Sequence, residues 1–205
     1  MNRIISSEGR ASVRWAALVV ALALAGEAGA APPSRFEPEL QVQGTPLLLN
    51  GSGTRFKAIF KVYDAALYVP RKVSTTEELL ALPGPKRMQF MALRDMPSAD
   101  IGRLFVKGMM ENSPSETAQM QAVSIARLIE VFSARSKILA GESFALEYVP
   151  GKGTTFEVAG KPQAAPFGDA EFFVMMLKIW FGPSPADLML KQALLGAPEA
   201  RSDQR

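Results

Sequence analysis

The residues with the clearest chemical potential lie on one extended stretch of the chain, which contains Arg55 and Tyr63. The alternating and β-branched residues 54–69 predict a single long strand, on which residues two apart share a face. One face of that strand would therefore carry Arg55, Ile59 and Tyr63. A planar guanidinium and a phenol beside an apolar side chain could hold an elongated anion. We expect these three residues to line a ligand-binding pocket.

Several other residues that resemble site residues have a structural explanation. Lys57 and Lys61 share the face of Arg55 on the expected strand, and we interpret them as part of a solvated sheet surface. The Gly-Ser-Gly sequence at 51–53 stands between two extended segments and not before a helix, so it predicts a turn and not a phosphate-binding loop. Asp95 at a strand end and Asp100 in the first turn of a helix are explained by local structure, and we assign them no catalytic role.

The composition excludes several classes of enzyme. The chain of 205 residues contains neither cysteine nor histidine. Disulfides, thiol nucleophiles, the usual zinc ligands, covalent haem attachment and a Ser-His-Asp triad each need one of these side chains. We therefore expect no metal and no cofactor. The formal net charge of +3, from 23 Lys and Arg against 20 Asp and Glu, is too small to indicate a nucleic-acid partner, and we expect none.

The first thirty residues have the pattern of a secretory signal peptide. Arginines precede an apolar run at 15–26, and the small residues Ala28-Gly29-Ala30 follow it. A membrane-spanning helix needs about 20 apolar residues, more than this run provides. We expect residues 1–30 to be a signal peptide that is cleaved after Ala30, which implies export to the periplasm and no transmembrane anchor afterwards. The proline-rich residues 31–39 predict a flexible leader.

The remaining chain predicts one domain over residues 40–196, followed by a frayed tail at 197–205. Strand patterns and helix patterns occur in separate blocks, which favours an α+β domain with an antiparallel sheet. We expect strands at 47–50, 54–69, 86–94, 142–149 and 154–159. We expect helices at 75–82 and 169–179, two consecutive helices that begin near 97 and 113, and a last helix from 184 to 196. The buried stripe of the helix that begins near 113 is expected to consist of Met120, Val123, Leu128, Ile129 and Phe132.

Two motifs at opposite ends of the domain resemble a known family. The first is Leu49-Asn50-Gly51-x-Gly53-x-Arg55, followed by Lys61-Val62-Tyr63-x-Ala65-Ala66-Leu67-Tyr68-Val69-Pro70. The second is Ile179-Trp180-Phe181-Gly182-x-x-Pro185, followed by Leu190-Lys191-x-x-Leu194-Leu195-Gly196. Both are similar to the bacterial chalcone isomerase-like proteins, and the resemblance covers roughly residues 40–196. It implies an open-faced sandwich, in which helices cover one side of an antiparallel sheet and a ligand cleft lies between them.

The resemblance also suggests which functions to consider. Catalytic members use an arginine, a threonine, a tyrosine, an asparagine and a late hydroxyl residue; here Tyr63 takes the threonine position and the late position falls at or next to Ile179. Asn112 lies in the segment of the asparagine, and Arg55 is the candidate arginine. Because most catalytic donors are absent, we expect a non-catalytic protein that binds an amphipathic small molecule, such as a fatty acid or an aromatic acid, through Arg55, Tyr63, Ile59 and Asn112.

Two other functions stay open. The first is an intramolecular lyase of the chalcone isomerase type, in which Arg55 is the electrophilic donor and Tyr63 a proton relay. The second is an interaction module of the cell envelope, which would use a sheet edge or the Trp180-Phe181 segment, expected to be a turn, to contact a protein partner of unknown identity.

Overall fold

The computed structural model describes residues 35–197, which form a large antiparallel sheet with helices on one face. The seven-stranded sheet has the order β1-β2-β3-β4-β7-β8-β9. Its strands are β1 (Glu39–Val42), β2 (Thr45–Lys57), β3 (Phe60–Val69), β4 (Lys86–Ala92), β7 (Ser143–Val149), β8 (Gly153–Val158) and β9 (Lys161–Pro162). All neighbouring strands pair antiparallel. The expected α+β class is therefore confirmed.

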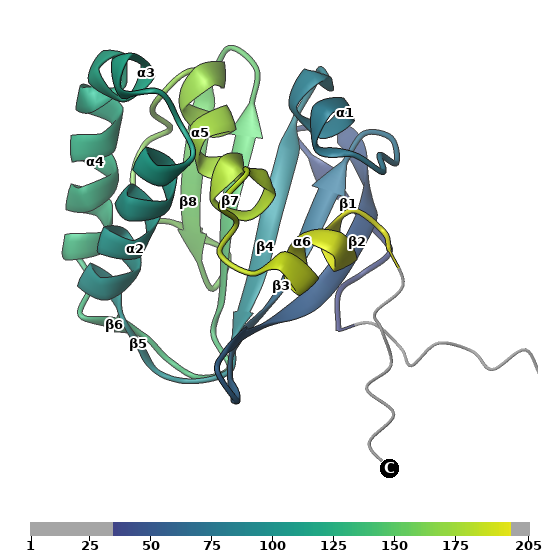
Figure 1. Cartoon of the computed structure of the whole chain (residues 1–205), viewed down its shortest axis with the longest axis horizontal. Helices are drawn as coiled ribbons and strands as arrows, with labels where there is room; N and C mark the ends of the chain where they lie inside the picture. Colours follow the sequence, from purple (N-terminus) through teal and green to yellow (C-terminus); the bar gives the residue numbers. More distant parts are fainter. Residues whose placement is uncertain (1–34, 198–205) are drawn as a thin grey trace, which may run out of the picture. The chain divides into compact units, whose positions relative to one another are not determined.

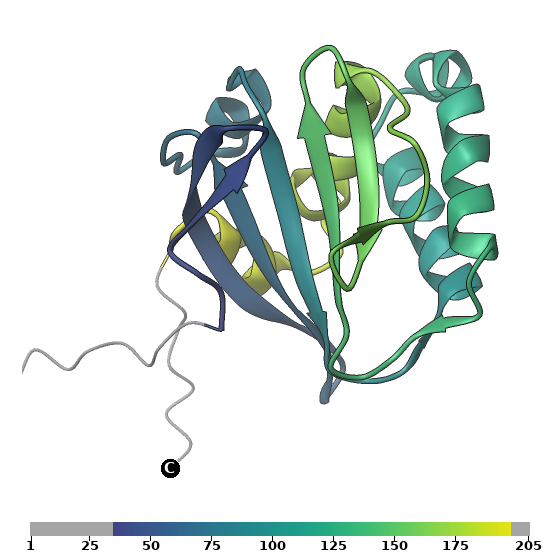
Figure 2. The ribbon, with the colours of Figure 1, turned by 180° about the vertical axis from the view of Figure 1, so that it is seen from behind.

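The helices gather on one side of the sheet, as Figure 1 shows, and the view from behind shows the opposite face of the sheet without them (Figure 2). They are α1 (Thr76–Ala81), α2 (Ser98–Glu111), α3 (Ser115–Met120), α4 (Ala122–Ser133), α5 (Ala170–Phe181) and α6 (Leu188–Leu194). A separate two-stranded ribbon pairs β5 (Met96–Pro97) with β6 (Lys137–Ile138). Among the residues that the structure describes, no helix is both long and apolar enough to cross a bilayer.

Aromatic side chains fill the space between the sheet and the helices. Phe90 of β4 stacks on Phe144 of β7, with ring centroids 4.6 Å apart, and Trp180 of α5 lies against Phe90 at 5.2 Å. Phe105 of α2 meets Trp180 edge-on at 5.3 Å. Burying each such ring stabilises the fold by about 1.5–3 kcal/mol relative to leaving it exposed. This packing fixes the distance between α2, α5 and the central strands.

The apolar helix expected at 169–179 is confirmed as α5, which is buried on nearly all sides. Asp169 caps its first turn by accepting a hydrogen bond from the Phe172 N–H at 2.9 Å. Trp180 and Phe181 belong to this helix and are buried. The expectation of a turn at 180–181 that could contact a partner is therefore wrong, because these side chains face the core.

The turn that was predicted at residues 51–53 is also wrong. Strand β2 runs through this sequence, although its pairing with β3 shifts register between Leu49 and Gly51, and the chain reverses at Ala58-Ile59, between β2 and β3. Gly51 is needed for a different reason, since a Cβ there would lie 2.1 Å from the Ala193 carbonyl oxygen at the end of α6. Ala58 takes a left-handed backbone with φ 54°. An Ala-Ile pair is not a typical hairpin turn, which hid the reversal from the sequence pattern.

The helix that begins near 113 is broken at Gln121, so its predicted stripe is only partly correct. Leu128 and Phe132 are buried, whereas Met120, Val123 and Ile129 are exposed. The buried Gln121 side chain donates to the Asp169 carboxylate at 3.1 Å. The break between α3 and α4 changes the helical phase, and it moves the first residues of the stripe to the surface.

Residues 36–38, which belong to the expected flexible leader, contact the sheet. Phe36 is buried in the same apolar cluster as Tyr68, on the sheet face opposite the helices. The Tyr68 hydroxyl donates to the Glu37 carbonyl at 2.8 Å, and the Leu49 N–H donates to the Pro38 carbonyl at 2.9 Å. Residues 36–38 are thereby fixed to the sheet. The expected signal peptide at 1–30 lies outside the described residues.

Candidate ligand-binding site

Arg55 and Tyr63 lie on neighbouring strands and are direct cross-strand partners in the β2–β3 register. The sequence pattern placed them on one face of a single strand, but the hairpin reversal at Ala58 brings them opposite each other. Paired residues of neighbouring strands point to the same side of the sheet. The Arg55 guanidinium carbon is 5.6 Å from the centre of the Tyr63 ring, within the range of a cation–π contact.

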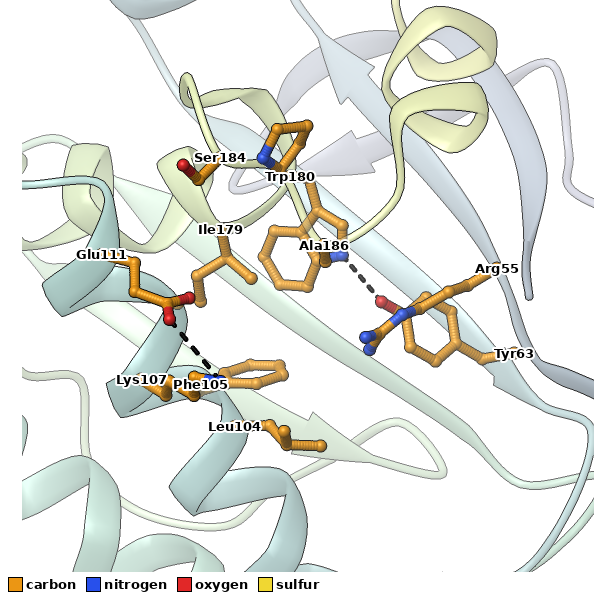
Figure 3. Close-up of a pocket in the computed structure, with 12 residues that line it drawn as sticks. Arg55, Tyr63, Leu104, Phe105, Lys107, Glu111, Ile179, Trp180, Ser184 and Ala186 are labelled. Atoms are coloured by element: carbon orange, nitrogen blue, oxygen red, sulfur yellow. Dashed lines mark hydrogen bonds and ion pairs between the residues drawn. The ribbon is translucent and has the colours of Figure 1, made fainter. Parts of the chain in front are cut away.

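A half-open cavity of about 250 Å³ lies next to this pair (Figure 3). Its walls come from β2, β3, α2, α5 and the loop that leads to α6. The lining residues are Arg55, Tyr63, Leu104, Phe105, Lys107, Gly108, Glu111, Ile179, Trp180, Ser184, Pro185 and Ala186. Lys107 and Glu111 form an exposed ion pair at 3.5 Å on the outer part of α2. The cavity thus combines apolar walls with a small number of polar groups, as ligand pockets commonly do.

Tyr63 is held by its ring and by its hydroxyl. The ring meets Phe90 edge-on at 5.3 Å, and the hydroxyl accepts a hydrogen bond from Trp180 Nε1 at 2.8 Å. Burial raises the pKa of Tyr63 above its usual value, and the nearby Asp187 adds to this, while the Arg55 charge and the Trp180 hydrogen bond act in the opposite direction. The phenol therefore stays protonated at neutral pH, and its O–H donates to no side chain or carbonyl within residues 35–197.

Arg55 brings a permanent positive charge to the cavity without a protein carboxylate to neutralise it. The side chain is half-buried, and its Nε is buried without a hydrogen-bond partner. No acidic group of the described chain forms an ion pair with it. An unpaired buried donor is costly, because water has been removed and nothing replaces it.

The Asp187 carboxylate, which is tied to the strand of Arg55, binds two backbone amides. Its Oδ1 accepts the Leu190 N–H at 3.1 Å and thereby caps α6. Its Oδ2 accepts the Phe56 N–H at 3.1 Å, which ties the start of α6 to β2. Both oxygens thus accept hydrogen bonds from backbone amides, and the described structure has no ion pair between Asp187 and Arg55.

The structure does not bring the other two predicted site residues to the cavity. Ile59 lies at the tip of the β2–β3 hairpin and is exposed. Asn112 is buried at the end of α2, where its Nδ2 donates to the carbonyls of Gly108 and Ser184 and its Oδ1 accepts the Ser184 N–H at 2.8 Å. Asn112 therefore holds the loop that forms one cavity wall, and all three of these hydrogen bonds are made to backbone groups.

Trp180 is the cavity residue that sequence reasoning did not select. A sequence signal for it exists, since a buried indole N–H almost always needs an acceptor. In the strongly apolar helix at 170–181, Trp180 carries such a donor and must meet a polar group of another element. Tyr63 is that group.

No cluster of three or more metal-ligating side chains occurs in the described part of the chain. The polar groups at the cavity are instead one guanidinium, one phenol, the Lys107–Glu111 pair and a serine. A guanidinium and a phenol O–H that face the same space can hold a carboxylate or polarise a carbonyl oxygen. This is the chemistry that the site offers.

A helix-covered antiparallel sheet with a cavity between its layers is the architecture of a known class of proteins. Residues 32–196 match the chalcone isomerase-like family, and the chain belongs to this family. The structure is similar to that of a fatty-acid binding protein of Arabidopsis thaliana, with a TM-score of 0.60 and 12% sequence identity over 78% of this chain and 90% of that chain. At this identity the likeness concerns the fold alone. Among curated protein sequences, none matches the chain.

Proposed function

We propose that this protein binds a small amphipathic carboxylic acid in the Arg55 cavity and does not transform it. The observation that carries the proposal is the Arg55 guanidinium, which lines the cavity and forms no ion pair within the described residues. A carboxylate in the cavity would pair with the Arg55 guanidinium and neutralise its charge. The Tyr63 O–H is positioned on the same wall as a second donor.

The similar Arabidopsis thaliana protein is a fatty-acid binding protein, which supports a carboxylate ligand for this architecture. The size of the cavity here favours a shorter ligand. An apolar cavity of about 150 Å³ holds benzene, so a volume of about 250 Å³ corresponds to about ten non-hydrogen atoms. Behind Trp180, the rings of Phe90 and Phe144 pack against each other and Phe90 contacts the indole. We infer a one-ring aromatic acid or a short fatty acid.

The same volume argues against ring closure of a chalcone at this site. Two aromatic rings at about 150 Å³ each exceed the cavity. If Arg55 and Tyr63 nevertheless polarised the ketone of such a substrate, the protein would accelerate the reaction over buffer. Ring closure is followed by absorbance in the presence and absence of protein, and we expect the same rate in both. A faster rate with protein that Arg55→Ala abolishes would contradict the proposal.

Calorimetric titration tests the binding function. Benzoate and octanoate are the acid probes, benzyl alcohol and octanol are their uncharged controls, and palmitate tests the length limit. We expect both short acids to bind at least about tenfold more tightly than the alcohols, because only the acids can pair with a guanidinium. Palmitate should bind no more tightly than octanoate. Equal binding of acids and alcohols, or no binding of either acid, would refute the proposal.

Export is a further part of the proposal. It is supported by the n-region, apolar run and small-residue order of residues 1–30. Expression of the full chain in a bacterium with two membranes, followed by fractionation and N-terminal sequencing, tests it. We expect a periplasmic form that begins at Ala31. An uncleaved chain in the cytoplasm would remove export from the proposal.

A further inference from the structure

The tip of the β2–β3 hairpin carries a run of exposed residues, Phe-Lys-Ala-Ile-Phe-Lys at 56–61. The exposed fraction is 83% for Ile59, 62% for Phe60 and 46% for Phe56. The tip lies at the lower end of the sheet in Figure 1, beyond the helix layer. Three large apolar side chains in one solvent-facing turn are unusual, because scattered single ones are the norm on a protein surface.

The charged side chains of the tip at 56–61 are both lysines, Lys57 and Lys61. Residues 55–63 contain Arg55, Lys57 and Lys61 but no acidic residue. Neither lysine forms an ion pair with any residue in the described part of the chain. Arg94, which is also exposed, follows Leu93, whose N–H donates to the Val62 carbonyl at 3.0 Å and so aligns the end of β4 with this hairpin. The tip thus combines apolar and basic side chains, and one carboxylate, that of Asp187, accepts the Phe56 N–H.

An anionic lipid surface fits this arrangement better than a protein partner does. A stable protein interface typically needs about 800 Å² and 20–30 residues on each side, whereas the tip offers six residues of a single turn. A bilayer interface accepts a few aromatic and aliphatic side chains at the boundary with the headgroups, and lysines beside them pair with anionic headgroups.

We propose that the 56–61 tip inserts into the headgroup region of anionic membranes and thereby holds the mouth of the cavity at the lipid surface. The tip adjoins the site directly, because Phe56 pairs with Lys61 immediately beyond the Arg55–Tyr63 pair. The start of α6, with exposed Leu188 and Met189, is tied to Phe56 through Asp187. An amphipathic acid could then pass between the bilayer and the cavity along a short path.

The absence of cysteine allows a site-specific test on the full chain. An environment-sensitive fluorophore is attached to Ile59→Cys and, as the matched control, to Val123→Cys on α4, since both positions are 83% exposed. The labelled proteins are mixed with vesicles of phosphatidylcholine that contain a minority of phosphatidylglycerol, with or without a lipid-borne quencher. Because the readout is local, membrane binding through another segment does not imitate insertion at position 59.

We expect a blue shift and quenching for the label at position 59 and no change for the label at position 123. The double substitution Lys57→Gln, Lys61→Gln should weaken the response at least about tenfold, and added salt should weaken it as well. Equal responses at both positions, or none at position 59, would overturn the proposal. So would a shift without vesicles that grows with protein concentration, because it would identify the tip as a contact between copies. The acid titrations are carried out without lipid, so either proposal can fail alone.

Discussion

The Trp180 indole donates its N–H to the Tyr63 hydroxyl over 2.8 Å, and this direction determines what the phenol can offer a ligand. An indole N–H is only a donor, so Tyr63 must be the acceptor. The phenol proton is then free to point away from Trp180. Because Tyr63 lines the cavity, a ligand there is a candidate acceptor for this proton. Trp180 thus acts as a positioning residue for a hydroxyl that is proposed to contact the ligand.

Replacement of Tyr63 by phenylalanine should affect both stability and binding. The Trp180 N–H would lose its acceptor in a buried position, which costs about 1–3 kcal/mol of unfolding free energy. Octanoate affinity should fall by about three- to tenfold, because one neutral hydrogen bond is removed. Urea unfolding and calorimetry measure the two effects. Unchanged affinity would show that the phenol does not contact the acid.

Replacement of Trp180 by phenylalanine should widen the cavity. The smaller ring leaves space beside Phe90 and Phe105, both of which contact the indole. We expect a loss of about 2 kcal/mol in unfolding free energy and a preference that shifts from octanoate towards decanoate. The shift is measured as the ratio of the two dissociation constants. A ratio equal to that of the unsubstituted protein would mean that Trp180 does not limit ligand length.

Stability should decrease in strongly alkaline solution. Burial raises the pKa of Tyr63, and it raises the pKa of Tyr68 to about 12, whereas an unfolded tyrosine ionises near pH 10. The folded state keeps its phenol protons when the unfolded state loses them, so this contribution is complete below about pH 10 and is lost as the pH rises towards 12. Urea unfolding at successive pH values measures the slope. Tyr63→Phe should reduce it, and an identical slope in that variant would contradict the assignment.

Gly51→Ala tests whether Gly51 is needed for the close approach of α6 to β2. A methyl group there would meet the Ala193 carbonyl oxygen at 2.1 Å, and backbone cannot move aside cheaply. We expect a loss of about 3 kcal/mol or more in unfolding free energy, together with weaker acid binding, because the loop that leads to α6 forms part of the cavity wall. Ser52→Ala on the same strand is the control and should change stability much less. An unchanged free energy of unfolding in Gly51→Ala would show that α6 does not pack tightly against Gly51.

How well the sequence predicted each element depended on whether its signal was local. The β7–β8 hairpin, with Pro-Gly-Lys-Gly at 150–153, and the apolar helix α5 were predicted because turn residues and continuous hydrophobicity are local properties. The reversal at Ala58-Ile59 was missed because neither residue is a turn former. Only the close approach of α6 in three dimensions explains Gly51.

The sequence predicted two of the residues that line the cavity, Arg55 and Tyr63, but not the way in which they come together. Arg55 and Tyr63 do share a face of the sheet, but through cross-strand pairing and not through alternation on one strand. The same misplaced turn put Ile59 beside them, whereas the hairpin carries it to the tip. Trp180 could be placed against Tyr63 only once the contact between α5 and the sheet was known, since 117 residues separate the two in sequence.

The central claim is that Arg55 recognises the carboxylate of the ligand. The most direct measurement is the ratio of octanoate to octanol affinity for Arg55→Met, with Arg127→Met, an exposed arginine of α4 paired with Glu130, as the matched control. Arg55→Met should bind octanoate about 10- to 100-fold more weakly and lose its preference for the acid, because a charge-assisted hydrogen bond is removed. Arg127→Met should retain both the affinity and the preference. An Arg55→Met protein that still prefers octanoate to octanol as strongly as the unsubstituted chain would contradict the claim.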